Sequence, residues 1–284
     1  MNIIGTGLSG LVGSRVRTLL SSEYGFENLS LETGVDIRNK KLVMERIASS
    51  PAPWIFHFAA ATDLDTAEKE RPLRKKSTAW QVNVEGTRNI AEAAKKYGKH
   101  VVYLSTDFVF DGNNPPYSED SMPNPQSWYA STKYEGEKII SGIGDQGLVI
   151  RIAFPYGTSV ASRPDFVQRM KRELQAGKTV YAVHDQLITP TFIDDIVRVI
   201  DALIKTGASG IYHAVGSEAI SPYSAALLIA DALRFNQKMI AQITWALYYK
   251  NRAPRPIRAV LKNVKISSLG VSMIPFREGV RFTV

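Results

Sequence analysis

Short apolar runs alternate along the chain with longer stretches in which apolar residues recur at helical spacing. Near-continuous apolar runs are typical of strands buried on both faces, and the amphipathic stretches between them predict the helices that cover a parallel sheet. We expect a strand that begins at Asn2, strands at 28–32, 54–61, 100–107, 147–154 and 210–216, and helices at 15–22, 81–98, 127–140, 191–205 and 221–235. This alternation predicts an α/β protein with a doubly wound parallel sheet.

The pattern becomes less regular after Pro155, and the last part of the chain is rich in proline and arginine. A chain of this length is expected to form one or two domains. We therefore predict a sheet domain made of residues 1–155 and 188–216, and a smaller C-terminal domain made of residues 156–187 and 217–284.

The sequence GTGLSGLVG, Gly5 to Gly13, joins the first expected strand to the first helix. Glycines at such a turn let the backbone approach a pyrophosphate at the helix N-terminus, which is typical of dinucleotide-binding Rossmann folds. The glycines fit two registers, one starting at Gly5 and one at Gly7. A first strand of ordinary length includes Gly5, and this favours a turn made by Gly7, Gly10 and Gly13.

An acidic residue, Glu32, ends the second expected strand, about 20 residues beyond the glycines. A carboxylate there can accept hydrogen bonds from the adenosine ribose. No arginine follows Glu32 directly, so the sequence favours NAD over NADP as the cofactor.

Tyr129 and Lys133 lie four residues apart in an expected helix and therefore share one face. We expect the ammonium to lower the pKa of the phenol, so that Tyr129 can exchange a proton with a carbonyl or alcohol oxygen. Tyr134 and Lys138 repeat the spacing, but Tyr134 lies about 140° further round the helix. We favour Tyr129, which follows the loop before the helix, and interpret Tyr134 as a packing residue.

The composition limits the possible partners. A formal net charge of +8 favours an anionic ligand, and the basic run Arg71–Lys76 lacks the interleaved aromatic residues of a nucleic-acid surface. The chain has no cysteine, no apolar run of about 18 residues and no signal-peptide pattern. We expect a cytoplasmic protein without a nucleic-acid or membrane partner.

Several motifs in order resemble the extended short-chain dehydrogenase/reductases, and within them the dTDP-4-dehydrorhamnose reductase family. They are GLSGLVG, FAAATDLDTAE (Phe58–Glu68), STDFVFDG, NPQSWYASTKYEGE, RIAFPYG, HDQLITPTFIDDIV and RAPRPIRAVL. The resemblance implies an NAD(P)-dependent reductase of a nucleotide-linked 4-keto-6-deoxy sugar, with a substrate-binding C-terminal domain and a homodimer as one arrangement.

The resemblance also assigns roles to individual residues. It implies Thr106 (rather than Ser105), Tyr129 and Lys133 as catalytic, with Tyr129 as proton donor and Lys133 bridging to the nicotinamide ribose. It implies Thr106, Asp107 and Phe154 as substrate-binding. Cofactor contacts are implied for Tyr129, Lys133 and a further set: Gly7, Gly10, Leu11, Val12, Gly13, Glu32, Asp36, Ile37, Ala60, Ala61, Thr62, Asn83 and Leu104.

The chain departs from the family pattern in its substrate half. Phe108 stands where a tyrosine is usual and Phe154 where a tryptophan is usual. Arg15 stands where some members carry a glutamate that binds a dimer-linking metal, so we expect no metal. Two other functions therefore stay open: a catalytically silent, cofactor-binding regulatory subunit like the methionine adenosyltransferase β-subunit, and an NAD-dependent nucleotide-sugar epimerase. One of the late basic residues is a candidate contact for the substrate pyrophosphate: Arg252, Arg255, Arg258 or Lys262.

Overall fold

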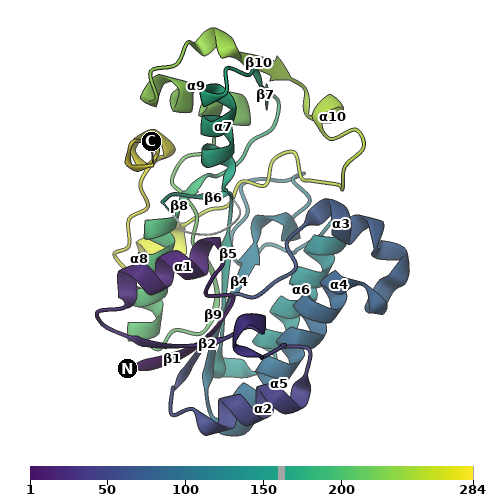
Figure 1. Ribbon diagram of the computed structural model, residues 1–284, viewed down its shortest axis with the longest axis vertical. Coiled ribbons are helices and arrows are strands. Elements are labelled where there is room, and N and C mark those ends of the chain that lie inside the picture. The colour runs from purple at the N-terminus through teal and green to yellow at the C-terminus, as the bar shows by residue number, and fades with distance from the viewer. Residues whose placement is uncertain (159–163, 284) are drawn as a thin grey trace.

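The computed structural model describes residues 1–158 and 164–283. At its centre (Figure 1) six strands form one sheet in the order β2-β1-β3-β4-β5-β9. All five pairings are parallel. The strands are β1 (Asn2–Thr6), β2 (Gly25–Leu29), β3 (Trp54–His57), β4 (His100–Thr106), β5 (Gly147–Ile152) and β9 (Gly210–His213). The predicted doubly wound parallel sheet is confirmed.

Helices cover both faces of this sheet (Figure 1). One face packs against α1 (Leu11–Leu20) and α8 (Ile193–Lys205), and the other against α2 (Lys40–Ser49), α5 (Thr87–Tyr97) and α6 (Trp128–Ser141). In α1, Val12, Val16 and Leu20 recur every four residues and are buried, so the apolar face seen in the sequence is the face that meets the strands.

The order of the strands creates a crevice at their carboxyl ends. β1 lies between β2 and β3, so the connections that leave β1 and β2 run in opposite directions across the sheet. Open α/β sheets bind their ligands at such a switch point, beyond the carboxyl ends of the strands.

A second apolar cluster lies at the upper end of the molecule in Figure 1, away from α2 and α5. It is built by α7 (Phe166–Gln175), α9 (Pro222–Ala232) and the paired strands β7 (Val180–Val183) and β10 (Ile240–Ile243). Short elements complete the chain: α3 (Leu64–Lys69), α4 (Thr78–Trp80), β6 (Pro155–Tyr156), β8 (Thr191–Phe192), α10 (Trp245–Tyr248), α11 (Val264–Ser267) and α12 (Phe276–Gly279). The predicted domain boundaries stay a proposal, and residues 159–163 of the segment 156–187 lie outside the described residues.

Several expected elements have other bounds in the structure: the first helix begins at Leu11 and not at Arg15, and β3 ends at His57 and not at Ala61. Two of the differences have a clear local cause. The strand expected at 28–32 ends at Leu29, because Ser30 and Thr33 form a capping box that starts a 3-10 helix at Leu31–Thr33. Glu32 therefore lies in a turn and not at a strand end. The helix expected at 81–98 begins as a π-helical segment, Gln81–Gly86, before α5, and it ends at Gly98, which adopts φ 65°.

No helix in the described parts of the chain is long and apolar enough to cross a membrane.

Candidate active site

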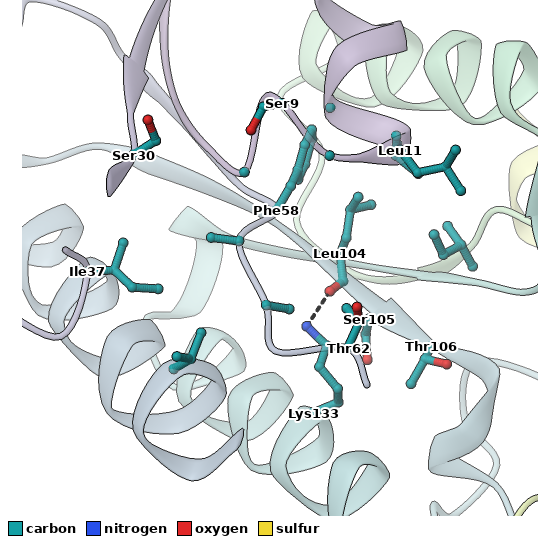
Figure 2. A pocket seen from close by; sticks show the side chains of 18 of the residues that line it. Ser9, Leu11, Ser30, Ile37, Phe58, Thr62, Leu104, Ser105, Thr106 and Lys133 are labelled. Atoms are coloured by element: carbon teal, nitrogen blue, oxygen red, sulfur yellow. Dashed lines mark hydrogen bonds between the residues drawn. The ribbon is translucent and has the colours of Figure 1, made fainter. Parts of the chain in front are cut away.

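A cavity of about 880 Å³ follows the carboxyl ends of the strands. That volume is in the range of small-molecule and cofactor sites. Figure 2 shows Ser30 and Ile37 on one side of it and Thr106 and Lys133 on the other. Most of the predicted cofactor residues line it: Gly7, Gly10, Leu11, Val12, Gly13, Glu32, Asp36, Ile37, Ala60, Thr62, Leu104, Tyr129 and Lys133. The predicted substrate residues Thr106, Asp107 and Phe154 line it as well.

The glycine turn uses the register that starts at Gly7. Gly7 has φ 67°, and a Cβ there would lie 2.5 Å from the backbone nitrogen of Ala59. A Cβ on Gly13 would lie 2.3 Å from the Gly7 carbonyl oxygen. Gly10 is the N-cap of α1 and supplies no side chain to cap the helix. The helix N-terminus therefore lies at the cavity without a capping side chain, which fits a pyrophosphate.

Gly5 belongs to β1, and the structure explains why it has no side chain. A Cβ at Gly5 would lie 2.5 Å from Cδ1 and Cγ of Leu8, which is fully buried. The leucine that follows Gly7 thus folds back over the strand, and Gly5 leaves the space for it.

The other end of the cavity carries a charged pair that the sequence analysis missed. The Arg38 guanidinium bonds Asp36 through Nε (2.9 and 3.0 Å) and Nη2 (2.6 Å), and both residues line the cavity. The pair holds the pKa of Asp36 below its usual range. The prediction of NAD rested on the absence of an arginine directly after Glu32, whereas Arg38, six residues further on, lines the cavity. In the sequence, Arg38 directly follows Asp36 and Ile37, two predicted adenine contacts, and this neighbourhood could have indicated that it reaches the cofactor site.

Two predicted cofactor residues, Ala61 and Asn83, are not among the residues that line the cavity. The Asn83 amide instead holds Ala61: its Oδ1 accepts from the Ala61 nitrogen (2.8 Å) and its Nδ2 donates to the Ala61 oxygen (3.1 Å). Nδ2 also donates to Thr132 Oγ1 on α6 (3.0 Å). Asn83 thus fixes the loop between Ala60 and Thr62 from behind.

The predicted catalytic residues come together from a strand end and a helix start. Thr106 ends β4, and Tyr129 lies in the first turn of α6, where Ser127 Oγ caps the helix by accepting from the Ala130 nitrogen. Lys133 Nζ donates to the Leu104 carbonyl oxygen at 2.7 Å, the dashed line in Figure 2, and lies 3.9 Å from the centre of the Tyr103 ring.

The expectation that Lys133 lowers the pKa of Tyr129 is wrong for this structure. Burial raises the pKa of Tyr129 and the Asp107 carboxyl raises it further, while a hydrogen bond with Thr106 opposes them. The buried phenol is therefore held in its protonated form. Burial lowers the pKa of Lys133 to about 7, and the Glu137 carboxylate opposes this.

Asp107 is buried beside these groups. Its Oδ1 accepts from Thr106 Oγ1 at 3.0 Å, and Oδ2 has no hydrogen-bond partner within the described residues. Burial raises the pKa of this carboxyl to about 7.

Aromatic side chains line the part of the cavity where the substrate is predicted to bind. Phe108 and Phe154 meet edge to face with ring centres 5.9 Å apart, and Phe166 packs edge-on against Phe154. Phe154 has φ 41°, a strained backbone for a residue with a bulky side chain. Strain of this kind persists where the surroundings fix it, as at ligand sites.

Other sequence candidates lie elsewhere. Tyr134 packs with the apolar cluster around Phe110, as expected of a packing residue. The four late basic residues (Arg252, Arg255, Arg258 and Lys262) are absent from the cavity lining given by the described residues, and Arg255 instead pairs with Asp65 at 3.0 Å. Arg15 pairs with Asp194 at the start of α8. The described residues hold no acid or histidine cluster able to bind a metal.

Comparisons with known proteins agree with these features. Residues 1–284 match the family model described as RmlD substrate binding domain. The chain is 31% identical over 274 residues to dTDP-4-dehydrorhamnose reductase of Aggregatibacter actinomycetemcomitans, covering 92% of this chain and 90% of the relative. It is 32% identical over 290 residues to methionine adenosyltransferase 2 subunit beta of Mus musculus, covering 97% and 85%.

A solved structure is similar along its whole length. The dTDP-4-dehydrorhamnose reductase of Bacillus anthracis in complex with NADP is 28% identical, with a TM-score of 0.89 over 98% of this chain and 96% of that one. The chain belongs to the RmlD family, the dTDP-4-dehydrorhamnose reductase-like proteins that its motifs resemble.

Proposed function

We propose that the protein is a reductase of a nucleotide-linked 4-keto-6-deoxy sugar, with Tyr129 as proton donor. Its family and the NADP-bound neighbour indicate an NAD(P)-dependent oxidoreductase. The observation that carries the finer proposal is the shared cavity. Thr106, Tyr129 and Lys133 line the same cavity as the glycine turn at Gly7.

The residues present fit a dinucleotide. When bound, the nicotinamide cofactor supplies the hydride that reduces the sugar carbonyl. The glycine turn and the N-terminus of α1 would hold the pyrophosphate, and Lys133 would bind the nicotinamide ribose. The chain's own part in the chemistry is to hold and move a proton.

That proton is held on Tyr129 Oη. The raised pKa keeps the phenol protonated at neutral pH, which is the form that a proton donor to a carbonyl oxygen needs. Thr106 Oγ1 would hydrogen-bond the same carbonyl oxygen and orient it. Phe108 and Phe154 exclude water from this end of the cavity.

The direct test is Tyr129→Phe, with Tyr134→Phe as the matched control from the same helix. Oxidation of NADPH is followed by absorbance with dTDP-4-keto-6-deoxy sugars as substrates. We expect Tyr129→Phe to lower kcat/KM by about 10²- to 10⁴-fold, the usual contribution of a general acid. Cofactor binding persists, and Tyr134→Phe behaves as wild type.

The regulatory alternative has one specific observation in its favour, the 32% identity with methionine adenosyltransferase 2 subunit beta over 97% of the chain. Wild-type protein that binds NADPH but turns over none of a panel of 4-keto sugar nucleotides would replace the reductase with this function. Inversion of a sugar centre without net cofactor oxidation would instead indicate the epimerase.

Two further expectations from the sequence remain predictions. A homodimer is tested by light scattering after size-exclusion chromatography. The cytoplasmic location is tested by fractionation of the source cells.

A further inference from the structure

A buried carboxylate lies behind the catalytic residues, between α6 and the sheet. Ser105 on β4 and Arg151 on β5 are paired in register, and Glu137 of α6 spans both. Glu137 Oε1 accepts from Ser105 Oγ at 2.5 Å and from Arg151 Nε at 3.0 Å, and Oε2 accepts from Arg151 Nη2 at 2.7 Å. Each of these three residues is at most 3% exposed.

The same helix and strand carry the catalytic groups. Tyr129, Lys133 and Glu137 are spaced by four residues and therefore lie along one face of α6. Ser105 stands in β4 between Leu104, whose carbonyl oxygen accepts from Lys133 Nζ, and Thr106. Figure 2 shows Leu104, Ser105, Thr106 and Lys133 together. The Ser105–Glu137 bond is thus a second tie between α6 and β4, one helical turn behind Lys133.

The ion pair is poorly explained by stability alone. A buried ion pair loses so much hydration that well-packed apolar side chains are often as stabilising. What the pair adds is a defined helix position, because a carboxylate bonded to two fixed strands holds α6 at one place along them. A displacement of about 1 Å in a catalytic group can cost about 10²-fold in rate.

Arg151 extends this contact to the segment between Asp107 and α6 and to β9. Its guanidinium lies 5.0 Å from the Phe110 ring centre, and its Nη1 reaches the Glu119 carbonyl oxygen at 3.5 Å. Nη1 also lies 3.3 Å from His213 Nε2, and burial lowers the pKa of His213 to about 3, so that the ring is neutral and can accept. The carboxylate of Glu137 therefore connects α6 with the segment that follows Asp107.

We propose that Glu137 is a positioning residue of the active site. Its carboxylate, held by Ser105 and Arg151, fixes α6 against β4 and so sets where Tyr129 and Lys133 stand relative to Thr106. The proposal rests on the proposed function for its kinetic consequence and on the contacts above for its geometry.

Two variants separate positioning from folding. Glu137→Gln keeps the shape of the side chain and removes the charge that pairs with Arg151. Ser105→Ala removes only the tie to β4 and leaves the ion pair in place, so it remains informative if Glu137→Gln folds poorly. Ile140→Val, a buried change on the same helix, is the matched control for altered packing.

The kinetic readout is the split between kcat and KM in the NADPH-oxidation assay. We expect Glu137→Gln to lower kcat about tenfold and Ser105→Ala about threefold, with KM within about twofold, because substrate contacts are kept while the proton donor is displaced. Ile140→Val keeps both constants, although its melting temperature falls.

A second readout does not require turnover. NADPH binding is followed by fluorescence between pH 6 and 9 in each variant. The titratable groups that act on Lys133 or contact it are His57 on β3, Tyr103 on β4 and Glu137 on α6. Among these, the Glu137 carboxylate supports the charged form of Lys133.

Glu137→Gln removes this support and leaves the positive charge of Arg151 uncompensated, so Lys133 loses its proton at lower pH. The pH at which NADPH binding weakens then moves down by about one unit, while Ile140→Val leaves it unchanged.

The outcomes are distinguishable. If wild-type protein turns over substrate, kinetic constants and pH midpoints in both Glu137→Gln and Ser105→Ala that match Ile140→Val overturn the positioning role. If wild-type protein shows no turnover, the reductase proposal fails, and the pH midpoint of NADPH binding alone decides the role of Glu137.

Discussion

At the scale of single residues, we expect Arg38 to decide the choice between NAD and NADP. Its pairing with Asp36 uses Nε and Nη2, so the Nη1 edge of the guanidinium points away from that carboxylate. An arginine near the adenosine ribose accommodates the 2′-phosphate of NADP. We expect Arg38→Gln to raise the Kd for NADPH about tenfold, the effect of losing one charge-assisted contact, and to leave the Kd for NADH within about twofold.

Both Kd values are measured by fluorescence titration, with Arg46→Gln on α2 as the control for a lost surface charge. If wild-type protein binds NADH more tightly than NADPH, the preference that we inferred from Glu32 was right and Arg38 has no part in cofactor selection.

Gly5 offers a second test at this scale. An added Cβ would lie 2.5 Å from the Leu8 side chain in a closely packed site. We expect Gly5→Ala to lower the free energy of unfolding by about 1–3 kcal/mol, the usual cost of overpacking. In a Leu8→Ala background the same change should cost less than about 1 kcal/mol. Urea unfolding of the four proteins measures this, and equal costs in both backgrounds would mean that the contact is unimportant.

These residues show what the sequence could and could not predict about the site. Strand length was enough to choose Gly7 over Gly5. The angle between Tyr129 and Tyr134 on a helix showed that only one of them can face the site, and the position of Tyr129 after the loop at the helix start favoured it. The pKa of Tyr129 was predicted in the wrong direction, because spacing places Lys133 on the same face but says nothing about burial or the Asp107 carboxyl. Arg38 was missed because a capped turn, which short polar side chains decide, brings it to the cavity.

At the scale of elements, α1 and α8 are joined by a polar contact as well as by their apolar faces. Arg15 Nε and Nη2 donate to the two carboxylate oxygens of Asp194 at 2.6 and 2.7 Å, and each side chain is 22% exposed. Bidentate geometry and partial burial make this pair stronger than an ordinary surface ion pair.

A double-mutant cycle with Arg15→Ala and Asp194→Ala measures the coupling. We expect a coupling energy of about 1 kcal/mol, which falls in 1 M salt because part of the pair is exposed to solvent. The Lys41–Glu45 pair on α2, with both side chains more than half exposed, serves as a comparison and should give a coupling near zero. Equal coupling energies for the two pairs would show that the Arg15–Asp194 pair is no stronger than an exposed ion pair.

Most elements were predictable because the spacing of their apolar residues indicates which face they bury. Two of the boundaries that failed are set by local hydrogen bonding. The second strand was placed too late because the capping box at Ser30 and Thr33 competes with the strand, and the π-helical start at Gln81–Gly86 has no apolar signature.

At the scale of the whole molecule, the parallel sheet, the order of motifs and the family could all be predicted from the sequence. What the sequence could not give is the environment inside the cavity, since burial results from segments far apart in the chain. Asp107 is an example, because its buried environment makes the stability of the entire fold depend on pH.

Burial raises the pKa of Asp107 from 3.8 to about 7, so the folded state binds the proton more tightly than the unfolded state does. The stability that this group contributes is complete below about pH 4 and is lost as the pH rises through about 7. A shift of about three pKa units corresponds to at most about 4 kcal/mol at pH 8. Asp107→Asn removes the titration and keeps an oxygen that can accept from Thr106.

We therefore expect Asp107→Asn to match wild type in free energy of unfolding near pH 4 and to be the more stable protein at pH 8, by up to about 4 kcal/mol. Urea unfolding of both proteins at intervals between pH 4 and 8 measures the difference, in which the titration of all other groups cancels. A difference that stays constant with pH would show that Asp107 is ionised in the folded protein throughout this range. Substrate contact at Asp107 would then be that of a carboxylate that only accepts hydrogen bonds, whereas a carboxyl that titrates near neutral pH can also donate one.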